Sequence, residues 1–138
     1  MNRVLASVML GAFLLLSAHL EIACGGELKI IQTHKTRDLV LTLRSEAGQW
    51  TPGKNAFVLE FTAPATTQPM DVGQVTLSTS MAMPGMAPMI AGATLAPDKS
   101  PGRYLGTISF GDSGARQVTV TWDGPAGKGS TRFSVPVR

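Results

Sequence analysis

The chain has 138 residues, of which 12 are Lys or Arg and 9 are Asp or Glu. This length suits one domain, because the roughly 115 residues that would follow a leader can bury one hydrophobic core. The net charge of +3 is spread along the chain, which excludes the clustered basic face that nucleic-acid binding requires. A single cysteine excludes an internal disulfide, so the fold must depend on its core.

The N-terminus has the layout of a secretory signal peptide. Arg3 supplies a positive charge, and an apolar run follows from Val4 to Leu16. A membrane-spanning helix needs about 20 apolar residues, whereas a signal peptide has a shorter run followed by small residues. We therefore expect residues 1–23 to form a signal-peptide helix and the mature protein to work outside the cytoplasm, facing the periplasm or the cell exterior.

We expect the signal peptide to be cleaved before a cysteine that carries a lipid anchor. The segment ending in Ala23 and Cys24 resembles a bacterial lipoprotein box, in which the cysteine is acylated and becomes the first residue of the mature protein. Gly25 and Gly26 would then form a flexible tether to the membrane. Cleavage by the ordinary signal peptidase, near Ala18 or Gly26, is the alternative and would give a soluble periplasmic protein.

The mature chain shows the alternation of apolar and polar residues that predicts half-buried β-strands. Turn signals rich in Gly, Pro and Asp separate the runs, and no segment keeps the period of a helix. About seven strands at this spacing predict an all-β antiparallel sandwich. The apolar positions, in chain order, are Leu28 to Gln32; Leu39, Leu41 and Leu43; Phe57, Leu59 and Phe61; Val72, Val75 and Leu77; Tyr104, Gly106, Ile108 and Phe110; Val118, Val120 and Trp122; and Phe133, Val135 and Val137.

These runs define a simple domain organisation. Residues 24–36 are expected to be a tether and the first strand, and residues 37–138 to be the sandwich domain. Most aromatic side chains fall on the alternating apolar faces, where packing in the core is their expected role. Trp50 lies next to a turn, and the sequence pattern around it does not indicate whether its side chain is buried.

One segment departs from this pattern because it is rich in methionine. Met81, Met83, Met86 and Met89 fall within nine residues, interrupted by prolines and a glycine. The prolines predict a loop or irregular edge rather than a strand or helix. Thioether sulfur is a neutral, polarizable ligand that suits Cu(I), and a turn at Pro84 and Gly85 would direct several sulfurs to one point.

Two interpretations of this segment stay open on spacing alone. The four methionines could bind copper, with His34, the only histidine of the mature chain, as a candidate additional ligand. Methionine also fills gaps in cores and forms adaptable surfaces for protein contacts. The segment could then cap one end of the sandwich or dock another protein without a metal.

The same segment resembles that of a known group of exported bacterial domains. The motif from Met83 to Met86 (MPGM), the later Pro101–Tyr104, the strand from Gly114 to Trp122 and the closing FSVPV resemble the YtkA-like and FixH-like family, from about Val40 to Val137. The resemblance implies an immunoglobulin-like β-sandwich in the bacterial envelope. It also implies relatives in copper-handling systems, such as heavy-metal efflux adaptors and oxidase assembly.

The expected function is therefore an exported, lipid-anchored protein that binds or hands on Cu(I) through its methionine segment. The candidate partners are the membrane, through Cys24, and an envelope transporter or an oxidase-assembly protein. A metal-free interaction module of an envelope or transport complex is the alternative. An enzyme is not expected, because the mature chain has one histidine and scattered carboxylates, whereas acid–base catalysis needs a positioned titratable pair.

The lipid anchor gives the first prediction. Protein purified from the membranes of expressing bacteria should begin at Cys24 and carry the added mass of acyl chains in mass spectrometry. Cys24→Ser should shift the protein from the membrane fraction to the soluble fraction, because a lipid anchor requires the thiol. A mature N-terminus that is unmodified and begins at another residue would contradict the assignment.

Overall fold

The computed structural model describes residues 27–125 and 127–138. The signal-peptide helix expected over residues 1–23 and the lipidation expected at Cys24 both lie outside these residues. Within the described ranges the chain forms nine strands: β1 (Lys29–Lys35), β2 (Val40–Ser45), β3 (Gly53–Thr62), β4 (Gln74–Met83), β5 (Met86–Gly92), β6 (Thr94–Pro97), β7 (Arg103–Phe110), β8 (Gly114–Gly124) and β9 (Gly127–Val137). A search of the described residues for a helix able to cross a lipid bilayer finds none.

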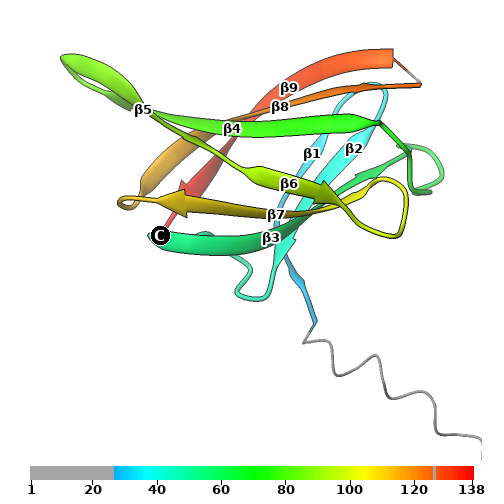
Figure 1. Ribbon diagram of the computed structural model, residues 1–138, viewed down its shortest axis with the longest axis horizontal. Coiled ribbons are helices and arrows are strands. Elements are labelled where there is room, and N and C mark those ends of the chain that lie inside the picture. Colours follow the sequence, from blue (N-terminus) through cyan, green and yellow to red (C-terminus); the bar gives the residue numbers. More distant parts are fainter. Residues whose placement is uncertain (1–26, 126) are drawn as a thin grey trace, which may run out of the picture.

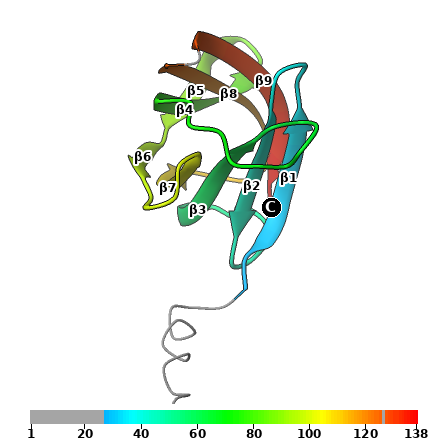
Figure 2. The same ribbon diagram turned by 90° about the vertical axis from the view of Figure 1, so that its right-hand side faces the viewer.

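The strands form two antiparallel sheets packed face to face. One sheet has five strands in the order β1-β2-β3-β7-β6, and the other has four in the order β5-β4-β8-β9. Figure 1 shows the two layers along their strands, and Figure 2 shows them turned by 90°. The predicted all-β antiparallel sandwich is confirmed.

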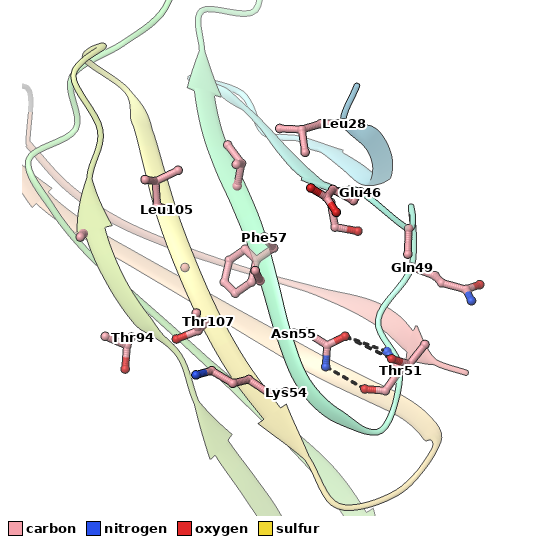
Figure 3. Close-up of a pocket in the computed structure, with 16 residues that line it drawn as sticks. Leu28, Glu46, Gln49, Thr51, Lys54, Asn55, Phe57, Thr94, Leu105 and Thr107 are labelled. Atoms are coloured by element: carbon pink, nitrogen blue, oxygen red, sulfur yellow. Dashed lines mark hydrogen bonds between the residues drawn. The ribbon is translucent and has the colours of Figure 1, made fainter. Parts of the chain in front are cut away.

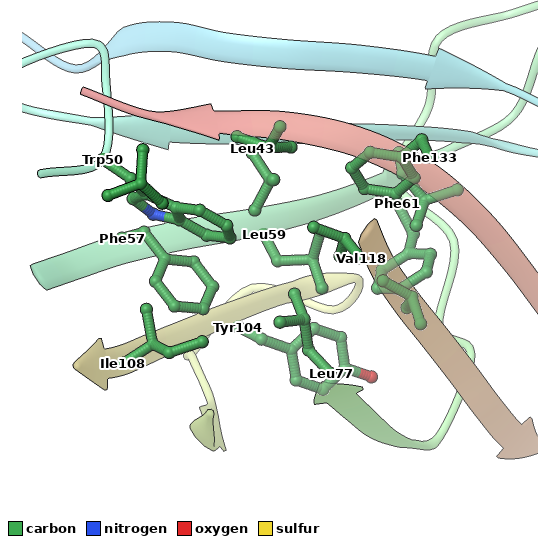
Figure 4. Close-up of a cluster of buried hydrophobic side chains, with 14 of the residues drawn as sticks. Leu43, Trp50, Phe57, Leu59, Phe61, Leu77, Tyr104, Ile108, Val118 and Phe133 are labelled. Carbon is green, nitrogen blue, oxygen red and sulfur yellow. The ribbon is translucent and has the colours of Figure 1, made fainter. Parts of the chain in front are cut away.

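The core lies between the sheets and is built from the alternating positions that the sequence indicates. Leu41, Leu43, Leu59 and Phe61 on one sheet, and Val118 on the other, are at most 1% exposed. Figure 4 shows Leu43, Leu59, Phe61 and Val118 meeting between the layers. Burying such side chains contributes about 1.5–3 kcal/mol each, which is how a domain without a disulfide can hold together.

Trp50 belongs to this core although it lies outside the named strands. Its side chain is fully buried, with its ring centroid 5.6 Å from that of Phe57 and 5.1 Å from that of Phe110. A bridge between Trp50 and Val137 joins the turn after β2 to the end of β9. Trp50, whose burial the sequence pattern did not indicate, therefore packs into the core at one end of the sandwich.

The structure corrects two expectations about the strands. The count is nine rather than about seven, and the methionine segment is not a loop, because β4 continues to Met83 and β5 begins at Met86. β5 and β6 each lie at one edge of their sheet. Proline is tolerated on an edge strand, where its missing N–H breaks no ladder, so Pro88 and Pro97 did not prevent strand formation.

Tyr104 ties β7 to the loop that precedes β4. Its hydroxyl donates a hydrogen bond of 2.5 Å to the carbonyl oxygen of Gly73. Gly73 has a φ of 82°, and a Cβ there would lie 2.4 Å from the carbonyl oxygen of Asp123, so only glycine fits. Burial, together with the nearby Asp71 carboxylate, raises the pKa of Tyr104 above its ordinary value of 10.0.

A raised phenol pKa makes the stability of the fold sensitive to alkaline pH. The neutral phenol is favoured in the folded state, so its contribution is complete below pH 10.0 and is lost as the pH rises through the higher folded pKa. Tyr104→Phe should lower the free energy of unfolding by about 1 kcal/mol at neutral pH through loss of the hydrogen bond. Urea unfolding between about pH 8 and pH 11 should show a shallower alkaline decline for the variant, and parallel declines would contradict the assignment.

Candidate metal centre

The methionine segment is a β-hairpin with a two-residue turn. Pro84 and Gly85 connect β4 to β5, and Gly85 has a φ of 72°. Proline at the second position and a left-handed glycine at the third suit a type II turn. Such a turn does not match the twist of a regular hairpin, and the register shifts between Met81 and Met83, directly behind the turn.

Strand pairing brings the four methionines together in two cross-strand pairs. Met81 lies opposite Met89, and Met83 lies opposite Met86. Residues directly opposite each other in an antiparallel pair share a face and have Cβ atoms about 4.5–5.5 Å apart. Between the two pairs, the bulge sets three residues of advance along β5 against two along β4. Met86 and Met89 can therefore both lie on the same face of the ribbon as Met83 and Met81, although they are three residues apart in sequence.

The hairpin extends past the sheet that carries it. Pairing between β4 and β8 ends at Ser80 and Gln117, whereas β4 itself continues to Met83. All four methionines therefore lie on a ribbon of two strands, β4 and β5, that projects from one end of the sandwich. Figure 1 shows this ribbon reaching beyond the other strands of its sheet, at the left of the view.

Contacts with the β7–β8 turn hold the base of this ribbon. A Cβ on Gly114 would lie 2.8 Å from Sδ of Met81, and a Cβ on Gly111 would lie 3.7 Å from Cε of Met89. The sulfur of Met81 therefore occupies space that is open only because residue 114 is glycine. The side chains of Met81 and Met89 therefore both lie against this turn.

Exposure differs between the two pairs in a way that permits access from solvent. Met81, Met83 and Met89 are half-buried, whereas Met86 is 70% exposed. The first pair is thus held against the body of the protein, and the second pair lies toward the tip. Solvent therefore reaches the side chain of Met86 more freely than those of the other three methionines.

His34 is not brought to this hairpin. Its Nε2 is 2.9 Å from Oγ1 of Thr131 on β9, and its ring stacks on Phe133 at 4.9 Å. β8 separates β9 from β4, and Thr131 is level with Leu77 rather than with Met81. With strands about 4.8 Å apart and a rise of about 3.3 Å per residue, His34 is too far away to share a ligand shell.

The donors at the hairpin fit a soft, monovalent metal ion and not a hard one. Within residues 27–125 and 127–138, no group of three or more His, Cys, Asp or Glu residues is placed to hold a metal. The hairpin itself brings together four thioethers. Neutral, polarizable sulfur is a ligand for Cu(I), whereas ions such as Mg²⁺ and Ca²⁺ require oxygen.

A buried arginine beside the hairpin was missed by the sequence analysis. Arg116 is 2% exposed, and its Nη2 donates to the backbone oxygen and to Oδ1 of Asp112, at 2.7 Å and 2.9 Å. Its guanidinium lies over the ring of Phe110, 5.1 Å from the centroid. The signal was present, because residue 116 continues the inward alternation of Val118 and Val120 and is charged where those are apolar.

A cavity of about 670 Å³ lies elsewhere on the molecule, beside β3, β6 and β7. Figure 3 shows Asn55 bonded to Thr51 at its rim, with Phe57 and Leu105 along its wall. Glu46 and Lys54 are the charged residues in its lining. This lining includes no methionine of the hairpin, so the cavity and the thioether cluster are separate features.

Glu60, an acid within a predicted strand, is engaged in ion pairs. Its Oε1 accepts from Nε of Arg44, and its Oε2 accepts from Nη1 of Arg103, both at 2.9 Å. These residues come from β2, β3 and β7, which are neighbours in the five-stranded sheet. Glu60 therefore cross-links three strands on the outer face.

These features define an antiparallel β-sandwich that carries a projecting, methionine-rich hairpin. The sequence model of the YtkA-like family matches residues 33–121, which is more than half of the chain. The chain belongs to the YtkA-like family, as its resemblance to that group predicts. No functionally curated protein has a significant sequence match to it.

Among solved structures, the chain resembles a copper-bound variant of FetP from uropathogenic Escherichia coli strain F11. The two share 10% sequence identity with a TM-score of 0.47, over 80% of this chain and 96% of that chain. The likeness is distant, and the copper is a property of that protein.

Proposed function

We propose that this protein is an exported, lipid-anchored, non-enzymatic component of the bacterial envelope that binds Cu(I) through its hairpin and hands it on. The observation that carries the proposal is the pairing of Met81 with Met89 and of Met83 with Met86. Strand pairing gathers the four thioethers on one ribbon, whereas a set of gap-filling methionines would be dispersed through the core.

The chemistry of thioethers suits reversible binding outside the cytoplasm. Thioether sulfur is a weak, neutral donor that does not titrate, so protons do not compete for it as they do for thiolate or imidazole. Oxidising compartments also make free thiols unreliable ligands. A site built from methionine would therefore keep its affinity for Cu(I) in mildly acidic surroundings and release the ion to a stronger ligand set.

The geometry also suggests a route for transfer. Met86 is 70% exposed near the tip, and the pair at the base is half-buried. A partner that approaches the tip would meet Met86 and Met83 first and could exchange ligands stepwise. An envelope transporter or an oxidase-assembly protein is the class of partner that this arrangement would serve.

A metal-free interaction module is the second candidate, and exposed apolar surface on β5 favours it. Met86 and Ile90 are 70% and 72% exposed, and exposed apolar residues that gather on one strand commonly mark a protein contact. In this case the hairpin would dock a partner through apolar area. Leucine could then replace methionine with little loss, because side-chain size and apolar character are similar.

Replacing the four hairpin methionines together by Leu distinguishes the copper-binding function from the metal-free interaction module. The replaced residues are Met81, Met83, Met86 and Met89. Cu(I) titration of the processed protein under reducing conditions, with a competing chelator, should show tight binding of the ion by the wild type. The quadruple variant should lose at least about 100-fold in affinity, because each lost donor removes one coordination bond. Thermal unfolding should confirm that the variant remains folded.

The matched control is Met70→Leu. Met70 lies outside the hairpin, and its backbone N–H bonds to the oxygen of Phe61 at the opposite end of β3 from the methionine ribbon. This replacement should leave Cu(I) affinity unchanged. If the quadruple variant binds Cu(I) as tightly as the wild type, the copper proposal fails. If it also retains binding to an envelope partner, the interaction module is supported.

A further inference from the structure

We infer that the buried Arg116 makes the methionine site selective for monovalent over divalent soft ions. This inference rests on the proposed function, since it concerns the same hairpin. It assigns to Arg116 and Asp112 the role of setting which ionic charge the thioether cluster accepts. Arg116 is a specificity-determining residue in this account and not a ligand.

The register places Arg116 next to the methionines. Thr79 pairs with Val118, and both side chains point into the sandwich. Pairing between the two strands ends at Ser80 and Gln117, and the same register extended by one more residue sets Met81 on β4 opposite Arg116 on β8. The sulfur of Met81 lies against Gly114, two residues before Arg116 on the same strand. The cation therefore borders the base of the thioether cluster.

The charge on this guanidinium is only partly compensated. Arginine stays protonated under all physiological conditions, and the Arg116 side chain is 2% exposed, whereas that of its partner Asp112 is 56% exposed. Solvent screens the carboxylate more than it screens the buried cation. Nε of Arg116 also finds no hydrogen-bond acceptor among the described residues. The base of the hairpin therefore has a net positive local field.

Such a field acts differently on ions of different charge. Coulomb repulsion rises in proportion to the charge of the ion, so a divalent ion is disfavoured twice as strongly as a monovalent one. The thioethers are neutral and cannot offset this repulsion. The site would accept Cu(I) and disfavour divalent ions that have a similar affinity for sulfur ligands.

The test uses Ag(I) and Cd(II), which have the same number of electrons and differ by one unit of charge. The measured quantity is the ratio of the two dissociation constants, Cd(II) over Ag(I), for the processed protein. Arg116→Gln should lower this ratio at least about tenfold, the change expected when one unit of charge is removed from within about 12 Å at an effective dielectric constant of about 20. Arg116→Lys should keep the ratio, because it keeps the charge.

Asp112→Asn gives an independent test of opposite sign. It removes the compensating carboxylate and leaves the guanidinium in place, so the ratio should rise. This variant also keeps the test decisive if Arg116→Gln does not fold. Lys99→Gln, which removes a positive charge from the turn between β6 and β7 at the other end of the sandwich, should not change the ratio.

The outcomes separate this inference from the proposed function. If the wild type binds Ag(I) but neither Arg116→Gln nor Asp112→Asn changes the ratio, the selectivity role of Arg116 is overturned and the thioether site stands. If the wild type binds neither ion, the proposed function is overturned together with this inference. Opposite shifts in the two variants support it.

Discussion

Antiparallel pairing of β4 with β5 is the constraint on which the functional account depends. The turn at Pro84 and Gly85 returns the chain so that Met81 faces Met89 and Met83 faces Met86. Sequence proximity alone would not achieve this, because alternate residues of one strand point to the same face but lie about 6–7 Å apart. Directly opposite residues on paired strands have Cβ atoms about 4.5–5.5 Å apart, so the hairpin sets the methionines of its two strands side by side.

The rest of the fold supports that hairpin without immobilising it. The sandwich behind it has a dense core, whereas the ribbon beyond Ser80 pairs only with itself. A two-stranded ribbon is marginally stable in isolation, so its tip belongs to the part of the structure that opens most easily. Contacts at Gly111 and Gly114 anchor its base. This combination of a fixed base and a weakly held tip would suit the proposed binding and release of Cu(I).

The fold was largely predictable, because the alternation of apolar and polar residues along Leu39–Leu43 and Phe57–Phe61 indicates which face of each strand is buried. The methionine ribbon was assigned to a loop or an irregular edge, since its prolines outweighed the weak alternation there. β6 has only four residues, which is too short to show a pattern. The methionines were visible from composition, but their pairing depends on register, which a single sequence does not reveal. His34 illustrates the same limit, because its distance from the hairpin follows from the order of β4, β8 and β9.

X-ray absorption spectroscopy of the protein loaded with one equivalent of Cu(I) tests the central claim most directly. Because strand pairing collects thioethers and leaves His34 on the far side of β8, the account predicts a first coordination shell with two or more sulfur atoms and no imidazole nitrogen. A shell dominated by nitrogen or oxygen would contradict it.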